Sequence, residues 1–141
     1  MNVVGYVTPR GFGLLSIPVP AQNSCLREFA ASVDLPYVLP PLEHTIPGSY
    51  MQLFTAINMA QSGDIVAMYS LLMFPSSLVK LNHIFELAVG KKISFYFVLE
   101  SRYIVSLQSF LVEYQSYEMR NLLDYSSQAS VESIRMLSAD A

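Results

Sequence analysis

The chain has 141 residues, a formal net charge of −3, and 13% charged against 52% hydrophobic residues. A length of this order builds one domain with its own core, whereas ordinary soluble domains carry roughly 25% charged residues. The eight Lys and Arg residues are scattered along the chain, which argues against the dense basic surface that nucleic-acid binding needs. The shortage of charge predicts a partly apolar surface of the kind that homo-oligomers bury.

Neither a membrane anchor nor a secretory signal is expected. The longest strongly apolar stretch, 65–79, contains several polar residues and is shorter than the ~20 residues that a bilayer requires. No basic region precedes an apolar stretch near residue 1, so the predicted location is cytoplasmic. Cys25 is the only cysteine, which excludes an internal disulfide.

The first half of the chain predicts two strands and two helices. Residues 2–8 form a first strand, because they are rich in β-branched and aromatic side chains. After a loop rich in Gly and Pro, residues 21–33 carry an apolar stripe at helical spacing. A short strand at 36–39 precedes a helix over 49–62, whose first and fourth residues, a Ser and a Gln, have the spacing of a capping box.

The second half continues the alternation. Residues 64–72 are almost continuously apolar, which is typical of a central parallel strand covered on both faces. A helix capped by Ser76 or Ser77 ends at Gly90, and a fourth strand follows over 93–99. From residue 105 the pattern is helical again, through about 123, and a shorter apolar segment comes after it.

This order predicts an α/β domain with three layers. The sheet would be mostly parallel and four-stranded, with helices on both faces and a long C-terminal helix. Residues 1–104 would form the α/β core, and 105–141 a helical segment of the same domain. We expect that segment to carry the interface of a homodimer or higher homo-oligomer, with Phe110 and Tyr114 in it.

Polar side chains follow the predicted strands or open the next helix. Ligands of parallel sheets bind at the carboxyl ends of the strands, so these side chains are expected to converge in one ligand-binding cleft. The expected set comprises Thr8, Arg10, Gln22, Asn23, Glu43, Ser70 and Glu100.

Arg10 is the decisive member of this set. Its guanidinium would offer a fork of donors to a phosphate or carboxylate, or it would pair with Glu43 or Glu100 and tie strand ends together. Glu43 and His44 are the candidates for an acid or base. The two histidines, His44 and His83, are far apart in the sequence and no further ligands complete a set, so neither a metal nor another cofactor is expected.

The segment from Gly5 to about Glu100 resembles the catalytic domain of the serine recombinases, or resolvases. The features shared with that family are, in chain order, Gly5-Tyr6, Gln22, Glu43, Gly63-Asp64 and Glu100. The resemblance implies a resolvase-like α/β fold whose long C-terminal helix carries the dimer interface.

The chemistry of that family does not transfer. Its arginine and nucleophilic serine after the first strand correspond here to Thr8 and Arg10, and its Asp-Arg-x-x-Arg corresponds to 72–76, Leu-Met-Phe-Pro-Ser. Phosphodiester cleavage needs an activated nucleophile and cations on the transferring phosphoryl group. The sequence therefore predicts no recombinase activity.

A second resemblance covers nearly the same span. The chain is similar to a family of small proteins from sporadic carbohydrate (polysaccharide) biosynthesis clusters, which implies a pathway and not a reaction. The matching segments are Gly5-Tyr6, Arg10-Gly11-Phe12, Ile17-Pro18, Gln22-Asn23, Leu26-Arg27, Leu39-Pro40, Glu43, Tyr50-Met51-Gln52-Leu53, Met68-Tyr69-Ser70-Leu71 and Val98-Leu99-Glu100.

Three hypotheses follow from the sequence. The first is a cytoplasmic protein of surface-carbohydrate biosynthesis that binds a sugar phosphate, a nucleotide sugar or a partner enzyme. The second is an enzyme that acts on an activated sugar, with Glu43 or His44 as acid or base. The third is a non-catalytic interaction subunit. Nucleic acid and membrane are not expected among the partners.

Overall fold

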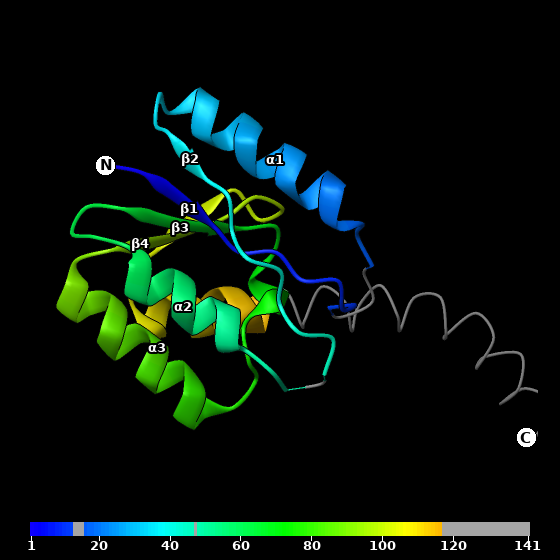
Figure 1. Ribbon diagram of the computed structural model, residues 1–141. Coiled ribbons are helices and arrows are strands. Elements are labelled where there is room, and N and C mark those ends of the chain that lie inside the picture. Colours follow the sequence, from blue (N-terminus) through cyan, green and yellow to red (C-terminus); the bar gives the residue numbers. More distant parts are fainter. Residues whose placement is uncertain (13–15, 47, 117–141) are drawn as a thin grey trace, which may run out of the picture. The chain divides into compact units, whose positions relative to one another are not determined.

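Strands and helices alternate along the chain in the computed structural model, which describes residues 1–12, 16–46 and 48–116 (Figure 1). The chain divides into two compact units, Met1–Phe110 and Leu111–Ala141. The elements are β1 (Val3–Gly5), α1 (Val19–Ser32), β2 (Tyr37–Val38), α2 (Met51–Met59), β3 (Ile65–Met68), the 3₁₀ turn η1 (Leu71–Met73), α3 (Leu78–Lys91), β4 (Ser94–Phe97) and β5 (Arg102–Ile104). Residues 107–116 are helical.

The sheet has the order β2-β1-β3-β4-β5. The first four strands are parallel, as predicted, and β5 is antiparallel to β4. The prediction of a four-stranded sheet was wrong, because β5 adds a fifth strand. Ser101, at φ 52°, turns the chain back directly after β4, so β5 is the return arm of a tight turn and is too short to show its own periodicity.

Helices cover both faces of the sheet, which confirms the three-layer α/β architecture. In Figure 1, α1 lies on one face and α2 and α3 on the other. On the α1 face, Leu26 and Phe29 of α1 pack in one buried cluster with Val3 and Ile65. The strand β3 is buried at all of its positions, as its continuous apolar sequence predicted.

An aromatic cluster fills the core on the opposite face. Phe74 lies 5.3 Å from Phe97 and 5.1 Å from Phe110, between ring centroids. Phe110 is only 1% exposed and also contacts Phe85. The expectation that Phe110 faces an oligomer interface was therefore wrong, because this side chain completes the core of its own chain. The predicted helix beyond residue 116 and the apolar segment after it lie outside the described residues.

Two helix ends differ from the predictions. The helix predicted over 49–62 spans Met51–Met59, and its N-cap, Tyr50, makes no side-chain capping hydrogen bond. The predicted capping box is therefore absent, and a distant carboxylate replaces it, as described below. The helix α3 continues through Gly90 to Lys91, and its C-cap, Lys92, adopts a left-handed conformation with φ 57°.

No helix in the described part of the chain combines the length and apolarity that crossing a bilayer requires.

Candidate functional site

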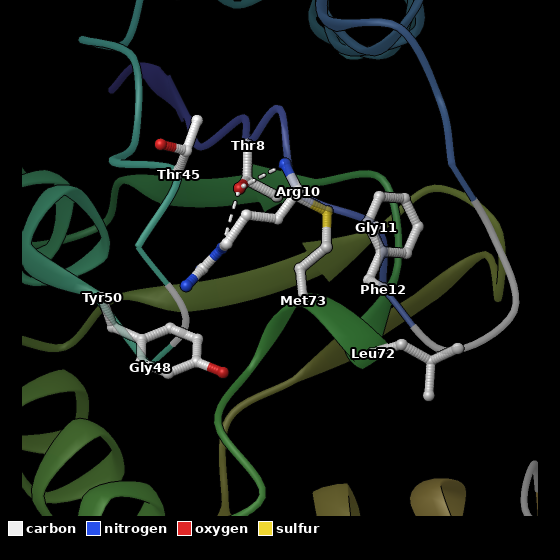
Figure 2. Close-up of a pocket in the computed structure, with 9 residues that line it drawn as sticks. All are labelled: Thr8, Arg10, Gly11, Phe12, Thr45, Gly48, Tyr50, Leu72 and Met73. Carbon is white, nitrogen blue, oxygen red and sulfur yellow. Dashed lines mark hydrogen bonds between the residues drawn. The ribbon is translucent and has the colours of Figure 1, made fainter.

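A pocket of about 440 Å³ opens where the chain leaves the first three parallel strands (Figure 2). Its described lining comes from the segments after β1, after β2 and after β3, so it lies at the carboxyl ends of the strands, where the sequence predicted the site. The lining residues are Thr8, Arg10, Gly11, Phe12, Thr45, Gly48, Tyr50, Leu72 and Met73.

Arg10 is the cation of this pocket. Its Nε donates to Thr8 Oγ1 at 3.3 Å, and its Nη1 donates to the carbonyl oxygen of Ile46 at 3.1 Å. The guanidinium carbon lies 4.9 Å from the centroid of the Tyr50 ring, a cation–π distance. Figure 2 shows the side chain lying across the pocket with its guanidinium beside Tyr50.

The alternative in which Arg10 ties strand ends together is not what the structure shows. Neither Glu43 nor Glu100 forms an ion pair with Arg10, and each of these carboxylates accepts hydrogen bonds from other donors. Within the described residues, the Arg10 side chain has a hydroxyl, a carbonyl oxygen and an aromatic face as its neighbours. Its positive charge is therefore not neutralised by either of the predicted carboxylates.

Lys80 brings a second positive charge close to the Tyr50 ring. Its Nζ lies 5.4 Å from the centroid of the Tyr50 ring and 3.4 Å from the carbonyl oxygen of Gly48. Nothing in the local sequence pattern predicts this contact, because Lys80 lies in the exposed first turn of α3, after the capping residue Ser77. Only the packing of α3 beside the segment 48–50 reveals it.

Gln22 does not line the pocket but holds the backbone of a residue that does, Thr8. It is fully buried, its Oε1 accepts from the Thr8 N–H at 3.2 Å, and its Nε2 donates to the carbonyl oxygens of Thr8 and Ile17, each at 2.8 Å. These bonds fix the backbone on which Thr8 and Arg10 stand. Asn23 lies elsewhere, because its Oδ1 accepts from the Tyr37 hydroxyl at 2.8 Å.

Glu43 is a buried structural carboxylate. Its Oε2 accepts from the Tyr6 hydroxyl at 2.9 Å and from the N–H groups of Gln52 and Leu53 at 3.1 and 3.3 Å. Those two N–H groups belong to the first turn of α2, so Glu43 caps that helix and neutralises its positive end. The pKa of the Tyr6 hydroxyl is raised far above its ordinary value, chiefly by burial and then by the negative charge of Glu43.

His44 lies at the surface beside this carboxylate. Its side chain is 46% exposed, and its Nδ1 is 3.6 Å from Glu43 Oε1 and 3.4 Å from Ser49 Oγ. Its backbone N–H donates to the same Glu43 oxygen at 3.0 Å. His44 is therefore the member of the predicted acid–base pair whose ring reaches solvent.

Ser70 and Glu100 form a separate pair behind η1. Ser70 Oγ donates to Glu100 Oε2 at 3.2 Å and accepts from the Leu72 N–H, while the Leu71 N–H donates to Glu100 Oε1. These bonds hold η1, from which Leu72 and Met73 reach the pocket. Of the predicted set, Thr8 and Arg10 line the pocket, while Gln22, Ser70 and Glu100 hold segments that line it.

Within residues 1–12, 16–46 and 48–116, no three His, Cys, Asp or Glu side chains lie together as a metal site would require.

Comparisons with known proteins identify the fold. No family model and no curated protein matches the sequence. Among solved structures, the chain is similar to a resolvase family site-specific recombinase from Streptococcus pneumoniae, with a TM-score of 0.57 and 15% identity over 95% of this chain and 99% of that one. It is also similar to the N-terminal catalytic domain of TP901-1 integrase, with a TM-score of 0.58 and 16% identity over 89% of this chain and 100% of that one. The fold is therefore resolvase-like, as the order of motifs predicted.

Proposed function

We propose that this chain binds a phosphorylated ligand, a sugar phosphate or nucleotide sugar, in the Arg10 pocket, as a cytoplasmic protein of surface-carbohydrate biosynthesis. The pathway rests on the sequence resemblance described above. The ligand class rests on one observation: Arg10 enters the pocket without an ion pair to either predicted carboxylate.

The donor geometry of Arg10 supports an anion. Guanidinium carries five N–H donors in a planar fork that matches phosphate or carboxylate oxygens. The described hydrogen bonds engage Nε and Nη1, both with neutral acceptors. Charge-assisted bonds to an anion are roughly twice as strong as bonds to neutral oxygens. An anion beside Arg10 would therefore improve on the present contacts of the guanidinium.

Recombinase chemistry is not part of the proposal. By the resemblance, Thr8 and Arg10 stand where the related family carries its arginine and serine, and Met73, which lines the pocket, stands where that family carries an arginine. The described lining residues thus include a cation that can bind a phosphate, but neither a serine nor the further arginines that transferring the phosphate requires.

The test is binding of sugar phosphates and nucleotide sugars to Arg10 variants, measured by calorimetry and thermal shift. Arg10→Ala should abolish binding and leave the melting temperature nearly unchanged, and Arg10→Lys should restore binding in part. Arg27→Ala is the matched control, because Arg27 also lies over an aromatic ring, Tyr37 at 5.7 Å, and does not line the pocket. Unchanged affinity in Arg10→Ala would refute the proposal.

A second candidate function is catalysis on an activated sugar, with His44 as the acid or base. The observation in its favour is the exposed imidazole beside the Glu43 carboxylate and the Ser49 hydroxyl. Glu43 is the weaker candidate, because both of its oxygens already accept hydrogen bonds in a buried place. His44→Asn should abolish turnover of nucleotide sugars without weakening their binding. If no ligand binds at all, the remaining hypothesis is an interaction subunit.

We also propose that the chain forms a homodimer or higher homo-oligomer. Val112, on the helical segment 107–116, is 62% exposed and offers an apolar contact that Phe110 cannot. Light scattering at micromolar concentration should show more than a monomer, and Val112→Asp should shift it toward monomer. Val79→Asp, on the exposed face of α3, is the matched control and should leave the assembly intact.

A further inference from the structure

The pocket has a cationic side and an apolar side. In Figure 2, the Arg10 guanidinium and Tyr50 lie on one side, Phe12 and Leu72 on the other, and Met73 lies between them. Phe12 and Met73 are 4% and 2% exposed, so they are packed in place, and the half-buried Leu72 offers more apolar surface to a ligand than either of them. Any ligand that fills the pocket must therefore present both an anion and an apolar face.

A sugar ring, which is lined with hydroxyl groups, does not provide the apolar face. Among the described lining residues, none carries a carboxylate or carboxamide, the groups that accept and donate to neighbouring sugar hydroxyls. The Thr8 hydroxyl already accepts from the backbone N–H and the Nε of Arg10. Sugar hydroxyls placed against Phe12, Leu72 and Met73 would lose their bonds to water and gain few in return.

A nucleobase does provide an apolar face. A base has a flat π-face that gains from contact with aromatic and apolar side chains whatever its identity, and methionine sulfur contacts aromatic rings favourably. The Phe12 ring is braced by Tyr69, with 6.0 Å between ring centroids. The apolar wall is therefore suited to a base.

The cationic side is suited to more than one phosphate. Arg10 and Lys80 both approach the Tyr50 ring, at 4.9 and 5.4 Å from its centroid. Each donates to a neutral carbonyl oxygen of the same segment, at Ile46 and at Gly48. Lys80 is not among the described lining residues, but its contact with the Tyr50 ring, which does line the pocket, would let each of the two cations meet one negative group of a diphosphate. The pocket volume of about 440 Å³ is within the range of small-molecule sites.

We infer that the pocket recognises a nucleoside diphosphate, with the diphosphate at Arg10 and Lys80 and the base against Phe12, Leu72 and Met73. This inference rests on the proposed anion site and makes the nucleotide, and not the sugar, the recognised part of the ligand. A sugar attached to the second phosphate would extend past Lys80 toward solvent.

The first experiment compares four probes by calorimetry on the full chain: uridine diphosphate, adenosine diphosphate, inorganic pyrophosphate and glucose 1-phosphate. At least one nucleoside diphosphate should bind about tenfold or more tightly than pyrophosphate and glucose 1-phosphate, a difference of about 1.4 kcal/mol. Equal affinity of pyrophosphate and the nucleotides would overturn this inference and leave the proposed function standing. Binding of none of the four would overturn both.

The second experiment separates the two sides of the pocket. Leu72→Ala should weaken nucleoside diphosphate binding and leave pyrophosphate binding unchanged, whereas Lys80→Ala should weaken both. Leu39→Ala is the matched control, because Leu39 is 57% exposed and does not line the pocket. Equal loss of nucleotide and pyrophosphate affinity in Leu72→Ala would contradict the inference.

Saturation-transfer NMR on the unmodified chain keeps the inference testable if the Leu72 variant does not fold. Base protons should receive the largest saturation, because they would lie against the buried Phe12 and Met73. Larger saturation at ribose or sugar protons would overturn the inference.

Discussion

Glu43 is a buried carboxylate that caps a helix to which it does not belong. An acidic residue after a strand predicts a ligand or an acid–base group, yet Glu43 accepts hydrogen bonds from Tyr6, 37 residues away, and from the first turn of α2. The local sequence suggested that the nearby Ser and Gln cap this helix, and the fold gave that role to a carboxylate from outside it. Such a long-range cap becomes visible only once the elements are placed.

Glu43→Gln should therefore destabilise the fold and not selectively abolish ligand binding. The change removes the negative charge at the α2 N-terminus and places an NH₂ group where the carboxylate accepts from Tyr6, Gln52 or His44. The free energy of unfolding should fall by about 1–3 kcal/mol in urea titrations. Glu28→Gln, on the exposed face of α1, should change it by less than about 0.5 kcal/mol. An unchanged stability would mean that Glu43 is not the cap described here.

The raised pKa of Tyr37 should make the folded protein less stable at high pH. Its hydroxyl donates to Asn23, and burial raises the pKa of Tyr37 from 10.0 to about 12, against a smaller lowering by the Arg27 charge. Between these values the unfolded chain has lost the phenolic proton and the folded chain keeps it, so stability is full below about pH 9 and falls as pH rises toward the folded pKa.

The measurement is the free energy of unfolding at several pH values in wild type and in Tyr37→Phe. The variant should show a slope between pH 10 and 12 that is shallower by about one proton. Some slope should remain in the variant, because the pKa of the buried Tyr6 is also raised. Identical slopes in the two proteins would place the Tyr37 hydroxyl in solvent.

At the scale of the elements, hydrophobic periodicity predicted most of the helices and strands. The buried run at β3 and the apolar stripe of α1 placed both elements correctly, because each must bury a whole face or stripe. The strand β5 was missed because three residues are too few to show a period, and the strand is defined only by its antiparallel pairing with β4. For the candidate site, strand-end topology predicted Thr8 and Arg10, which line one pocket. It could not predict Lys80, whose contacts depend on how α3 packs.

Phe110 should contribute strongly to the stability of the core of residues 1–110. Its ring contacts Phe74 at 5.1 Å, Phe85 at 5.6 Å and Phe97 at 6.2 Å between centroids, and it is 1% exposed. Phe110→Ala should cost about 3–5 kcal/mol, the usual range for a buried phenylalanine. Val112→Ala, on the same helical segment but 62% exposed, should cost less than about 0.5 kcal/mol. Similar losses in the two variants would contradict this role of Phe110.

At the scale of the whole molecule, the chain combines a resolvase-like fold with a negative net charge. The chain shares its architecture with solved recombinase catalytic domains at 15% and 16% identity, but its net charge is −3. Fold alone does not carry activity, since function depends on the groups placed at the site. Here the described lining of the strand-end pocket combines one cation, Arg10, with uncharged side chains such as Thr8 and Leu72.

The chain should therefore neither cut nor tightly bind duplex DNA. Affinity for duplex DNA comes largely from cations that neutralise phosphates, and the chain has only eight Lys and Arg residues against eleven Asp and Glu. A gel-shift assay at physiological salt should show no sub-micromolar complex, and supercoiled plasmid should stay intact. The double variant Thr8→Arg with Arg10→Ser should also leave plasmid intact, because restoring the first strand end still leaves η1 without the arginines that would stabilise a transferring phosphoryl group. Nicking by the unmodified chain would refute this prediction, whereas nicking by the double variant alone would show that the first strand end suffices for strand cleavage on this fold.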